Sequence, residues 1–221
     1  MLYLVATPIG NLSDMTLRGI EVVKNCDYVL CEDTRRTRIL LNRYLIDKPL
    51  LSYHSFNEAQ REPKILEDLK RGLNVALLCD AGTPGLCDPG ERLARRCFEE
   101  NLPITSIPGP CSIPVALSLS GFPTLPFQFI GFLPKKPKEL KKILCDAFSY
   151  PGTTLCFETP HRIKKTLKYI DAACPEKLLC MCRELTKIHE EVLRGKASEL
   201  MARFAEKPPK GEMVLLFSSK T

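Results

Sequence analysis

The sequence lacks the features by which membrane-spanning, metal-binding and disulfide-bonded proteins are usually recognised. It has no run of about 18 or more apolar residues, which is the length that a membrane-spanning helix requires. The three histidines are scattered and no CxxC pair is present, so we expect no metal site. The eleven cysteines are odd in number, and several lie in apolar runs, namely Cys31, Cys79, Cys156 and Cys180. This pattern favours buried, reduced thiols in a cytoplasmic protein over a disulfide framework.

Length, composition and charge leave several classes of function open. A chain of 221 residues allows one large domain or two small ones, and 44% hydrophobic with 26% charged residues is ordinary for a globular protein. Residues 1–6 lack the basic stretch of a signal peptide, so we expect them to form a first strand. The net charge of +6 is compatible with RNA or with an acidic small molecule and identifies neither.

Two phosphate-binding motifs are also absent from the places where they would be expected. The segment DAGTPGLCDPG at residues 80–90 follows an apolar run, but no GxxxxGK[ST] motif is formed there. The GxGxxG fingerprint is missing after the first expected strand, where Thr7-Pro8-Ile9-Gly10 stands instead. The 80–90 segment is therefore either a plain tight connection or a loop that holds a ligand through its backbone. Adenosyl groups are ligands of the second kind, and Gly82 and Gly85 allow a close backbone approach.

Apolar strand-like runs alternate with helical patterns along the whole chain. In the first part, strands are expected near 2–6, 27–31, 50–53, 74–79 and 104–107, with helices between them. This alternation predicts a parallel sheet covered by helices on both faces. The segment 121–126 holds one glycine and two prolines and is the best candidate linker. We therefore predict an N-terminal α/β lobe over 1–120 and a C-terminal α/β lobe over 127–221.

Unusual side chains follow several of the expected strands. Because the carboxyl ends of parallel strands share one edge of a sheet, many of these breaks are expected to lie together, beside a cleft between the two lobes. Basic clusters at 35–38, 95–96, 135–142 and 164–165 support an RNA surface only when taken together, since each alone is typical of a solvated helix face.

Ten motifs in order resemble the small-subunit ribosomal RNA methyltransferase I family of the tetrapyrrole methylase superfamily. They are TPIGNL (7–12), CEDTR (31–35), SYHSFNE (52–58), DAGTPGLCDPG (80–90), IPGPCS (107–112), SGFP (120–123), GFLP (131–134), ETPHR (158–162), RELTKIHEE (183–191) and KGEMVLLF (210–217). The resemblance spans essentially the whole chain. One departure is that members often continue for several dozen residues beyond the final strand, so we expect one RNA-contacting surface to be missing after Thr221.

The resemblance implies a fold, a cofactor, a substrate and a set of site residues. It implies a two-lobed α/β fold, with a mostly parallel sheet in the first lobe, a mixed sheet in the second and a ligand cleft between them. Family members use S-adenosyl-L-methionine to methylate the ribose 2′-hydroxyl of a cytidine in small-subunit rRNA, and they resemble homodimers. The partner expected here is accordingly rRNA or a ribosomal particle, and neither a membrane nor DNA. The cofactor-binding residues implied are Ile9, Gly82, Thr83, Pro84, Leu86, Ser112, Ile113 and Leu185, with a further contact near Glu158.

A ribose hydroxyl is a weak nucleophile that benefits from a general base. The catalytic candidates at strand ends are Asp33, His54 and Glu184, for which an ion pair or a structural hydrogen bond is the competing interpretation. Arginine holds phosphate oxygens through paired donors. The candidates for substrate binding are Arg35, Arg162, Arg183 and Lys187.

Two other functions remain open at this point. The first is methylation of a tetrapyrrole or another small molecule, for which a closed apolar acceptor site would be expected. The second is a non-catalytic, ribosome-associated RNA-binding protein.

Overall fold

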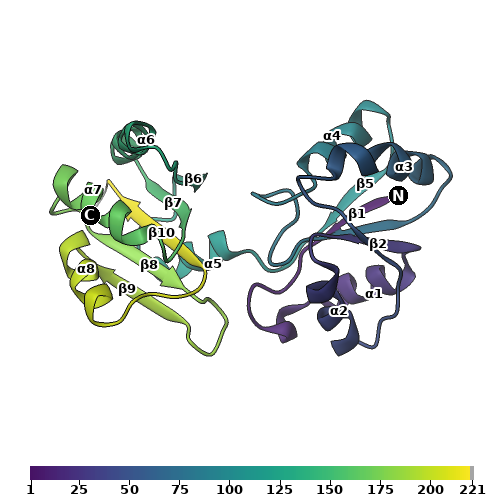
Figure 1. Ribbon diagram of the computed structural model, residues 1–221, viewed down its shortest axis with the longest axis horizontal. Coiled ribbons are helices and arrows are strands. Elements are labelled where there is room, and N and C mark those ends of the chain that lie inside the picture. The colour runs from purple at the N-terminus through teal and green to yellow at the C-terminus, as the bar shows by residue number, and fades with distance from the viewer. Residues whose placement is uncertain (220–221) are drawn as a thin grey trace. The chain divides into compact units, whose positions relative to one another are not determined.

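Strands alternate with helices along the computed structural model, which describes residues 1–219 (Figure 1). The chain divides into two compact units, Met1–Cys111 and Ser112–Thr221. The strands of the first unit are β1 (Leu2–Val5), β2 (Tyr28–Cys31), β3 (Leu50–Ser52), β4 (Val75–Leu78) and β5 (Ile104–Ile107). Its helices are the short 3-10 helix η1 (Leu12–Asp14) and the α-helices α1 (Leu17–Asn25), α2 (Thr34–Arg43), α3 (Glu58–Lys70) and α4 (Glu91–Glu99).

The first unit is a parallel sheet with helices on both faces, as the alternating pattern predicts. Its strand order is β3-β2-β4-β1-β5, and every neighbouring pair is parallel. One core cluster joins α1 and α2 to the sheet through residues such as Val23 and Leu41. Another joins α3 and α4 to the sheet through Ile65 and Leu93. Since all four residues of β4 are buried, its continuous apolar run is what a central parallel strand requires.

The second unit contains the mixed sheet that the resemblance implies. Its strands are β6 (Phe127–Phe132), β7 (Thr153–Glu158), β8 (Leu179–Arg183), β9 (Glu191–Gly195) and β10 (Met213–Ser218), in the order β6-β7-β10-β8-β9. Only the β6–β7 pair is parallel, and the other three pairs are antiparallel. Its helices are α5 (Ser112–Ser120), α6 (Pro137–Ser149), α7 (Ile163–Ala173) and α8 (Ala197–Glu206).

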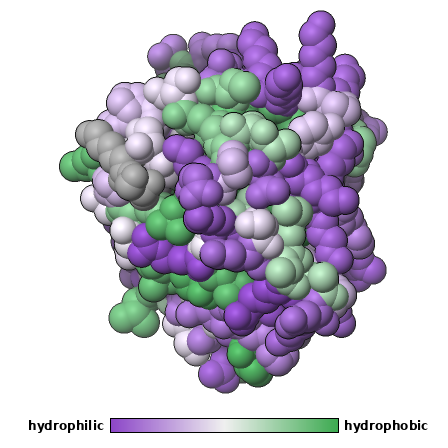
Figure 2. All heavy atoms as spheres, turned by 90° about the vertical axis from the view of Figure 1, so that its left-hand side faces the viewer, coloured by the Kyte–Doolittle hydropathy of each residue, from purple (hydrophilic) through white to green (hydrophobic). Residues whose placement is uncertain are grey.

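Helices cover this second sheet unequally. The helices α6, α7 and α8 share one core with the side chains that point to one face, among them Cys156, Met181 and Leu215. On the other face, α5 packs against β8, β9 and β10. Figure 2 looks onto the side where α7 and α8 lie, and hydrophilic residues cover most of it with smaller hydrophobic patches between them.

The boundary between the units lies earlier than predicted. The sequence places residues 112–120 in the first lobe and the linker at 121–126, whereas the structure places all of α5 in the second unit. The reason is tertiary packing. Buried Ala116 of α5 contacts the second sheet, since its carbonyl oxygen lies 3.9 Å from Cys182 Sγ. The turn at the Pro- and Gly-containing IPGPCS motif therefore precedes the domain change.

The cysteines, the helices and the grouping of possible metal ligands bear on three of the expectations for the chain. The four cysteines expected in apolar strands are all free and buried thiols. Within residues 1–219, no helix is long and apolar enough to cross a bilayer. No three histidine, cysteine or acidic side chains of this part of the chain are grouped as a metal site would require.

Candidate functional site

The carboxyl ends of β1 and β4 form a topological switch point. The chain leaves β1 toward β2 and leaves β4 toward β5, which are opposite directions in the strand order β3-β2-β4-β1-β5. The helices that follow these two neighbouring strands, α1 and α4, accordingly pack on opposite faces of the sheet. Open α/β sheets bind ligands in the crevice that such a reversal leaves at the carboxyl edge.

The 80–90 segment begins at this point and is fastened to the end of β1. Thr7 and Gly82 form an isolated antiparallel bridge, in which Thr7 N donates to Gly82 O at 2.8 Å and Gly82 N donates to Thr7 O at 3.0 Å. The Thr7 hydroxyl donates to Cys79 O at 3.0 Å. The φ of Gly82 is +90°, a conformation that residues with a side chain rarely adopt. A fixed turn therefore stands at the switch point, and it requires a glycine.

Five of the predicted cofactor-binding residues lie at this edge, namely Ile9, Gly82, Thr83, Pro84 and Leu86. A Cβ atom added to Gly82 would lie 3.5 Å from Ile9 Cγ2 and 3.9 Å from Pro110 O, which are ordinary contacts. Pro84 is buried, whereas Leu86 is 39% exposed. The structure thus brings the first-unit members of the predicted set together around an apolar, backbone-lined turn. Their role in binding stays a prediction.

The remaining predicted cofactor contacts belong to the second unit. Ser112 is the first residue of α5, and Ile113 beside it is buried. Leu185 follows β8 and is also buried. Glu158 ends β7, where it is buried and accepts hydrogen bonds from the Thr166 hydroxyl and from Thr159 N. These bonds give Glu158 a structural role in joining β7 to α7.

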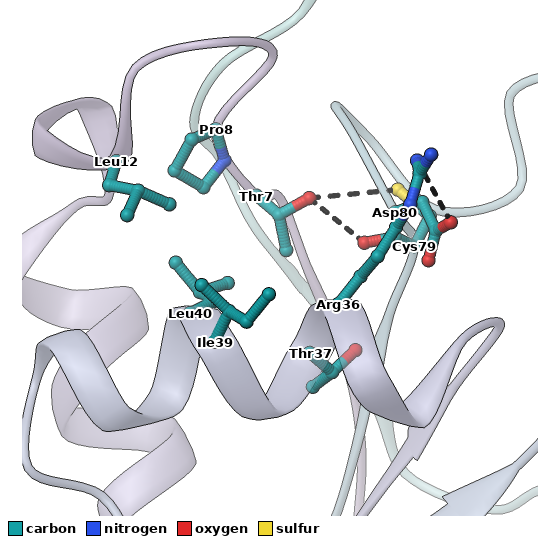
Figure 3. Close-up of a pocket in the computed structure, with 9 residues that line it drawn as sticks. All are labelled: Thr7, Pro8, Leu12, Arg36, Thr37, Ile39, Leu40, Cys79 and Asp80. Carbon is teal, nitrogen blue, oxygen red and sulfur yellow. Dashed lines mark hydrogen bonds and ion pairs between the residues drawn. The ribbon is translucent and has the colours of Figure 1, made fainter.

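A small hollow of about 200 Å³ lies beside the switch point, between the segment after β1 and helix α2 (Figure 3). Figure 3 shows Pro8, Leu12 and the side chains of Ile39 and Leu40 on one side of it. On the other side, Arg36 reaches the Asp80 carboxylate at 3.2 Å. The hollow is apolar with one polar wall.

Asp33, a predicted catalytic residue, is occupied by local contacts. It is the N-cap of α2, and its Oδ1 accepts from Arg35 N at 2.9 Å. Both Asp33 oxygens also accept from the Arg35 guanidinium, at 3.1 and 2.8 Å. The side-chain hydrogen bonds from Arg35 lower the pKa of Asp33 to about 2. A carboxylate with so low a pKa is a poor general base near neutral pH.

A second hollow, of about 310 Å³, lies at the ends of β2 and β3 beside the 80–90 turn. Its lining is mostly polar and consists of Glu32, Ser55, Glu58, Cys87, Asp88, Pro89, Glu91, Arg92 and Arg95. Burial raises the pKa of Glu32 above its ordinary value, and the nearby Asp80 adds to the effect. Glu32 forms no ion pair within residues 1–219, which distinguishes it from its neighbour Asp33. Sequence reasoning missed Glu32, because burial decides between the two adjacent carboxylates.

His54, the second predicted catalytic residue, has its tautomer set by Asn57. Asn57 Oδ1 accepts from His54 N at 2.8 Å, which turns Asn57 Nδ2 toward Ser52 O at 3.1 Å and His54 Nε2 at 3.3 Å. An amide nitrogen only donates, so Nε2 of a neutral imidazole accepts and Nδ1 carries the proton. His54 Nδ1 is buried and has no hydrogen-bond partner within residues 1–219.

The predicted substrate-binding arginines differ in how accessible they are. Arg35 is 88% exposed, and its pair with Asp33 is a surface ion pair that contributes little stability. Arg162 donates to the carbonyl oxygens of Leu133 and Pro134. Buried Arg183 donates to Glu191 at 2.6 Å and to Lys210 O at 3.1 Å. The last two arginines therefore hold loops of the second unit together.

Glu184 and Lys187 form one ion-paired turn after β8. Lys187 Nζ lies 2.9 Å from Glu184 Oε1 and 2.9 Å from Glu212 Oε2. Burial alone would raise the pKa of Glu184, but its hydrogen bonds from Lys187 and from Glu212 N outweigh burial and lower it. The φ of Glu184 is +51°, in the left-handed region. Glu184, the third predicted catalytic residue, is thus tied into its own turn.

Comparisons with known proteins show which family the chain belongs to. Residues 1–201 match the family described as Tetrapyrrole (Corrin/Porphyrin) Methylases. The chain is 41% identical to the Ribosomal RNA small subunit methyltransferase I of Thermotoga maritima, over 99% of this chain and 98% of that protein. A protein of the same name from Hydrogenobaculum sp. is 42% identical over 99% of this chain and 96% of the relative. The chain belongs to the ribosomal RNA small subunit methyltransferase I family, within the tetrapyrrole methylases.

Membership of the methyltransferase I family confirms the resemblance carried by the ten motifs. A solved structure of cobalt precorrin-4 methyltransferase, a cobalamin biosynthetic enzyme, is similar with a TM-score of 0.72. The match covers 98% of this chain and 94% of the methyltransferase chain, at 17% sequence identity, so the likeness shows a shared fold. The predicted fold class, with a parallel sheet followed by a mixed sheet, is confirmed. The protein is a methyltransferase by family.

Proposed function

We propose that the chain uses S-adenosyl-L-methionine to methylate the ribose 2′-hydroxyl of a cytidine in small-subunit rRNA. The observation that carries the proposal is the identity of 41% and 42% over nearly the whole chain to two proteins named for small-subunit rRNA methylation. The switch-point turn supports it, because it offers a backbone-lined place for a nucleoside.

The residues around Gly82 fit an adenosyl group. A Cβ at Gly82 would occupy space beside Ile9 with no contact shorter than 3.5 Å. Ile9, Pro84 and Leu86 supply apolar surface for a flat ring, and the backbone supplies donors and acceptors for its edge. We propose that Thr83 belongs to the same wall, and that Ser112, Ile113 and Leu185 contribute from the second unit. The cleft between lobes that the sequence predicts stays a prediction.

When bound, S-adenosyl-L-methionine supplies a sulfonium methyl group for transfer to the acceptor oxygen. The task of the chain is to hold the ribose hydroxyl in line with that methyl and to receive the hydroxyl proton. We propose that Glu32 accepts this proton, since its pKa is raised by burial and it forms no ion pair within the described residues. Asp33 then serves to cap α2. His54 follows the neighbouring strand β3 and positions the loop after it.

Substrate contacts are proposed for the basic side chains that remain accessible. Arg35 is highly exposed, and its weak surface pair with Asp33 is easily exchanged for a phosphate. Lys187 is 30% exposed and offers a third donor beyond its two carboxylate partners. Arg162 and Arg183 are assigned the structural roles described above in place of direct phosphate binding. We further propose that the protein acts in the cytoplasm as a homodimer on a ribosomal particle.

Two measurements test the proposal. Equilibrium binding of S-adenosyl-L-methionine comes first, and absence of binding at millimolar ligand would contradict any methyltransferase function. Mass spectrometry of rRNA nucleosides then follows incubation with small ribosomal particles from a deletion strain. A 2′-O-methylcytidine is expected. Cofactor binding without rRNA methylation would favour a small-molecule acceptor, whereas particle binding without any methylation would favour a non-catalytic RNA-binding protein.

A further inference from the structure

Four phenylalanines form a strip on the second sheet, on the face that α5 occupies elsewhere. Phe127, Phe129 and Phe132 of edge strand β6 pair in register with Thr153, Leu155 and Phe157 of β7. The Phe157 ring packs against Phe129 at 4.9 Å and against Phe132 at 5.2 Å between centroids. These four residues, Phe127, Phe129, Phe132 and Phe157, are called the aromatic strip below.

A β-bulge builds the strip. Between Phe129 and Phe132 the chain advances three residues, while the partner strand advances two, from Leu155 to Phe157. In a regular strand, Phe129 and Phe132 would point to opposite faces. The extra residue, with Gly131 at a φ of +67°, turns Phe132 to the same face as Phe129. The backbone is thus distorted to gather aromatic rings on one surface.

The strip is not covered as a core would be. Phe127 is 43% exposed and Phe132 is 53% exposed. The helix on this face, α5, packs mainly against β10, β8 and β9, whereas β6 is the edge strand on the far side of β7. An edge strand with exposed hydrophobic side chains is an aggregation hazard unless something binds it. The exposure of these rings therefore points to a ligand.

Unpaired lysines adjoin the strip. The chain runs from Phe132 through Leu133 and Pro134 directly into the lysines that precede and begin α6. Those that are exposed and form no ion pair within residues 1–219 are Lys135, Lys138, Lys141 and Lys142. Within α6, the last three follow the spacing i, i+3 and i+4 and so share one face. A cation in the first turn of a helix opposes the helix dipole, so Lys138 does not serve to stabilise α6.

We propose that the aromatic strip and these lysines together bind a single-stranded segment of the rRNA substrate. The inference rests on the proposed function and names a surface by which the substrate is held. Exposed aromatic rings stack on unpaired bases, and adjacent lysines bind the phosphates without regard to sequence. The same arrangement, rings on a sheet with a basic border, is suited to a strand whose bases are splayed out. A folded duplex would contact the lysines and leave the rings unused.

The test measures RNA affinity, salt dependence and methylation of the full-length protein. The probes are a short single-stranded oligoribonucleotide and the small ribosomal particle that lacks the modification. Replacing Phe132 by alanine is expected to weaken oligonucleotide binding roughly 5- to 140-fold, the range for one lost base stack. Replacing Lys135, Lys138, Lys141 and Lys142 by glutamine is expected to lower the slope of log affinity against log salt by roughly 3. Both variants should raise KM for particles and leave S-adenosyl-L-methionine affinity and kcat unchanged.

Matched controls lie elsewhere in the chain. Phe98 on α4 is 73% exposed, and its alanine variant should bind RNA as the wild type does. Lys164, Lys165 and Lys168 on α7 are exposed, and their glutamine variants should keep the wild-type salt slope. If the wild type methylates particles but the Phe132 variant binds RNA unchanged, the surface inference is overturned and the function stands. A change from dimer to monomer at constant RNA affinity would assign the strip to a second copy and overturn it as well. If the wild type binds no cofactor, the proposed function itself fails.

Discussion

Gly82 offers the sharpest test of the switch-point turn. Its φ of +90° is strained for any residue with a side chain, so Gly82→Ala is expected to cost about 1–3 kcal/mol of folding stability. The new methyl would enter the space beside Ile9 without meeting the protein closer than 3.5 Å. If that space receives the adenosyl group, the methyl overpacks the complex by about 1–3 kcal/mol, which is a loss of affinity of roughly 5- to 140-fold.

Stability and binding have to be separated, and Gly72 makes this possible. Its φ is +89°, nearly the same as that of Gly82, but a Cβ there meets nothing within 4 Å. Gly72 lies between α3 and β4, at the amino ends of the strands, whereas the 80–90 turn lies at their carboxyl ends. Gly72→Ala should therefore carry a similar backbone strain with no effect on the ligand. Thermal unfolding checks the strain, at about 2–4 °C per kcal/mol for a chain of this size.

Isothermal titration with S-adenosyl-L-methionine, at a temperature well below both unfolding transitions, decides the matter. The expected result is a weakened Gly82→Ala and an unchanged Gly72→Ala. Equal affinity of Gly82→Ala and wild type would show that the turn is only a connection between β4 and α4. Equal losses in both variants would show that affinity follows stability and that contact with the ligand is not involved.

Four further predictions rest on the described contacts. In a methyl-transfer assay, Glu32→Gln should lower kcat by about 10²- to 10⁴-fold and leave S-adenosyl-L-methionine affinity unchanged. Asp33→Asn keeps a capping side chain, so its kcat should stay within about tenfold of the wild type. A general base acts when deprotonated, and the pKa of Glu32 is raised, so wild-type kcat/KM should fall as pH drops through a value above the ordinary glutamate pKa. If kcat/KM instead falls only at or below the ordinary glutamate pKa, Glu32 is not the base. Hydrogen bonds, chiefly from Arg183, lower the pKa of Glu191 in the folded protein. The ionised Glu191 therefore stabilises the fold above its pKa in the unfolded chain, near 4.3, and this stabilisation is lost as pH falls through the lower pKa of the folded state. Glu191→Gln should thus be less stable than the wild type by about 1–3 kcal/mol in urea unfolding at neutral pH and equal to it in acid, and a constant difference would contradict this. Leu93→Ala, at a position with 0% exposure, should lose about 2–5 kcal/mol, and a loss below 1 kcal/mol would show that α4 is loosely packed.

The fold was accessible from the sequence because its signals are local. Continuous apolar runs such as β4 and the regular spacing of helices such as α3 depend on residues close in the chain. The domain boundary was not accessible, since α5 is a short helix of small and apolar residues with no marked polar face. Whether such a helix packs on the first or the second sheet is decided by the surface it meets, and the Pro- and Gly-containing 121–126 segment gave a misleading signal.

The site was only partly accessible for a similar reason. The turn at Gly82 could be predicted because its glycine and proline signature lies within a few residues, whereas the role of Gly82 in binding stays a prediction. The roles of Arg162 and Arg183 could not, because their partners lie far along the chain, at Leu133 and at Lys210. The aromatic strip was hidden by its bulge, since a period of two places Phe132 on the face opposite to Phe129. A register shift is a property of a strand pair, and one strand's sequence does not contain it.

The two acidic residues of the CEDTR motif, Glu32 and Asp33, are adjacent in the chain but have different surroundings and opposite pKa shifts. Asp33 has an extended backbone, with φ −115° and ψ 109°, so consecutive side chains there point in opposite directions. Asp33 turns to the first turn of α2, where amide and guanidinium donors lower its pKa to about 2. Glu32 turns to the polar hollow, where burial raises its pKa. Adjacent carboxyls whose environments push their pKa values apart are suited to different tasks. Asp33 is fixed as an anion that orders the helix start, whereas Glu32 forms no ion pair within residues 1–219 and is the carboxyl to which we assign the proton transfer as a proposal.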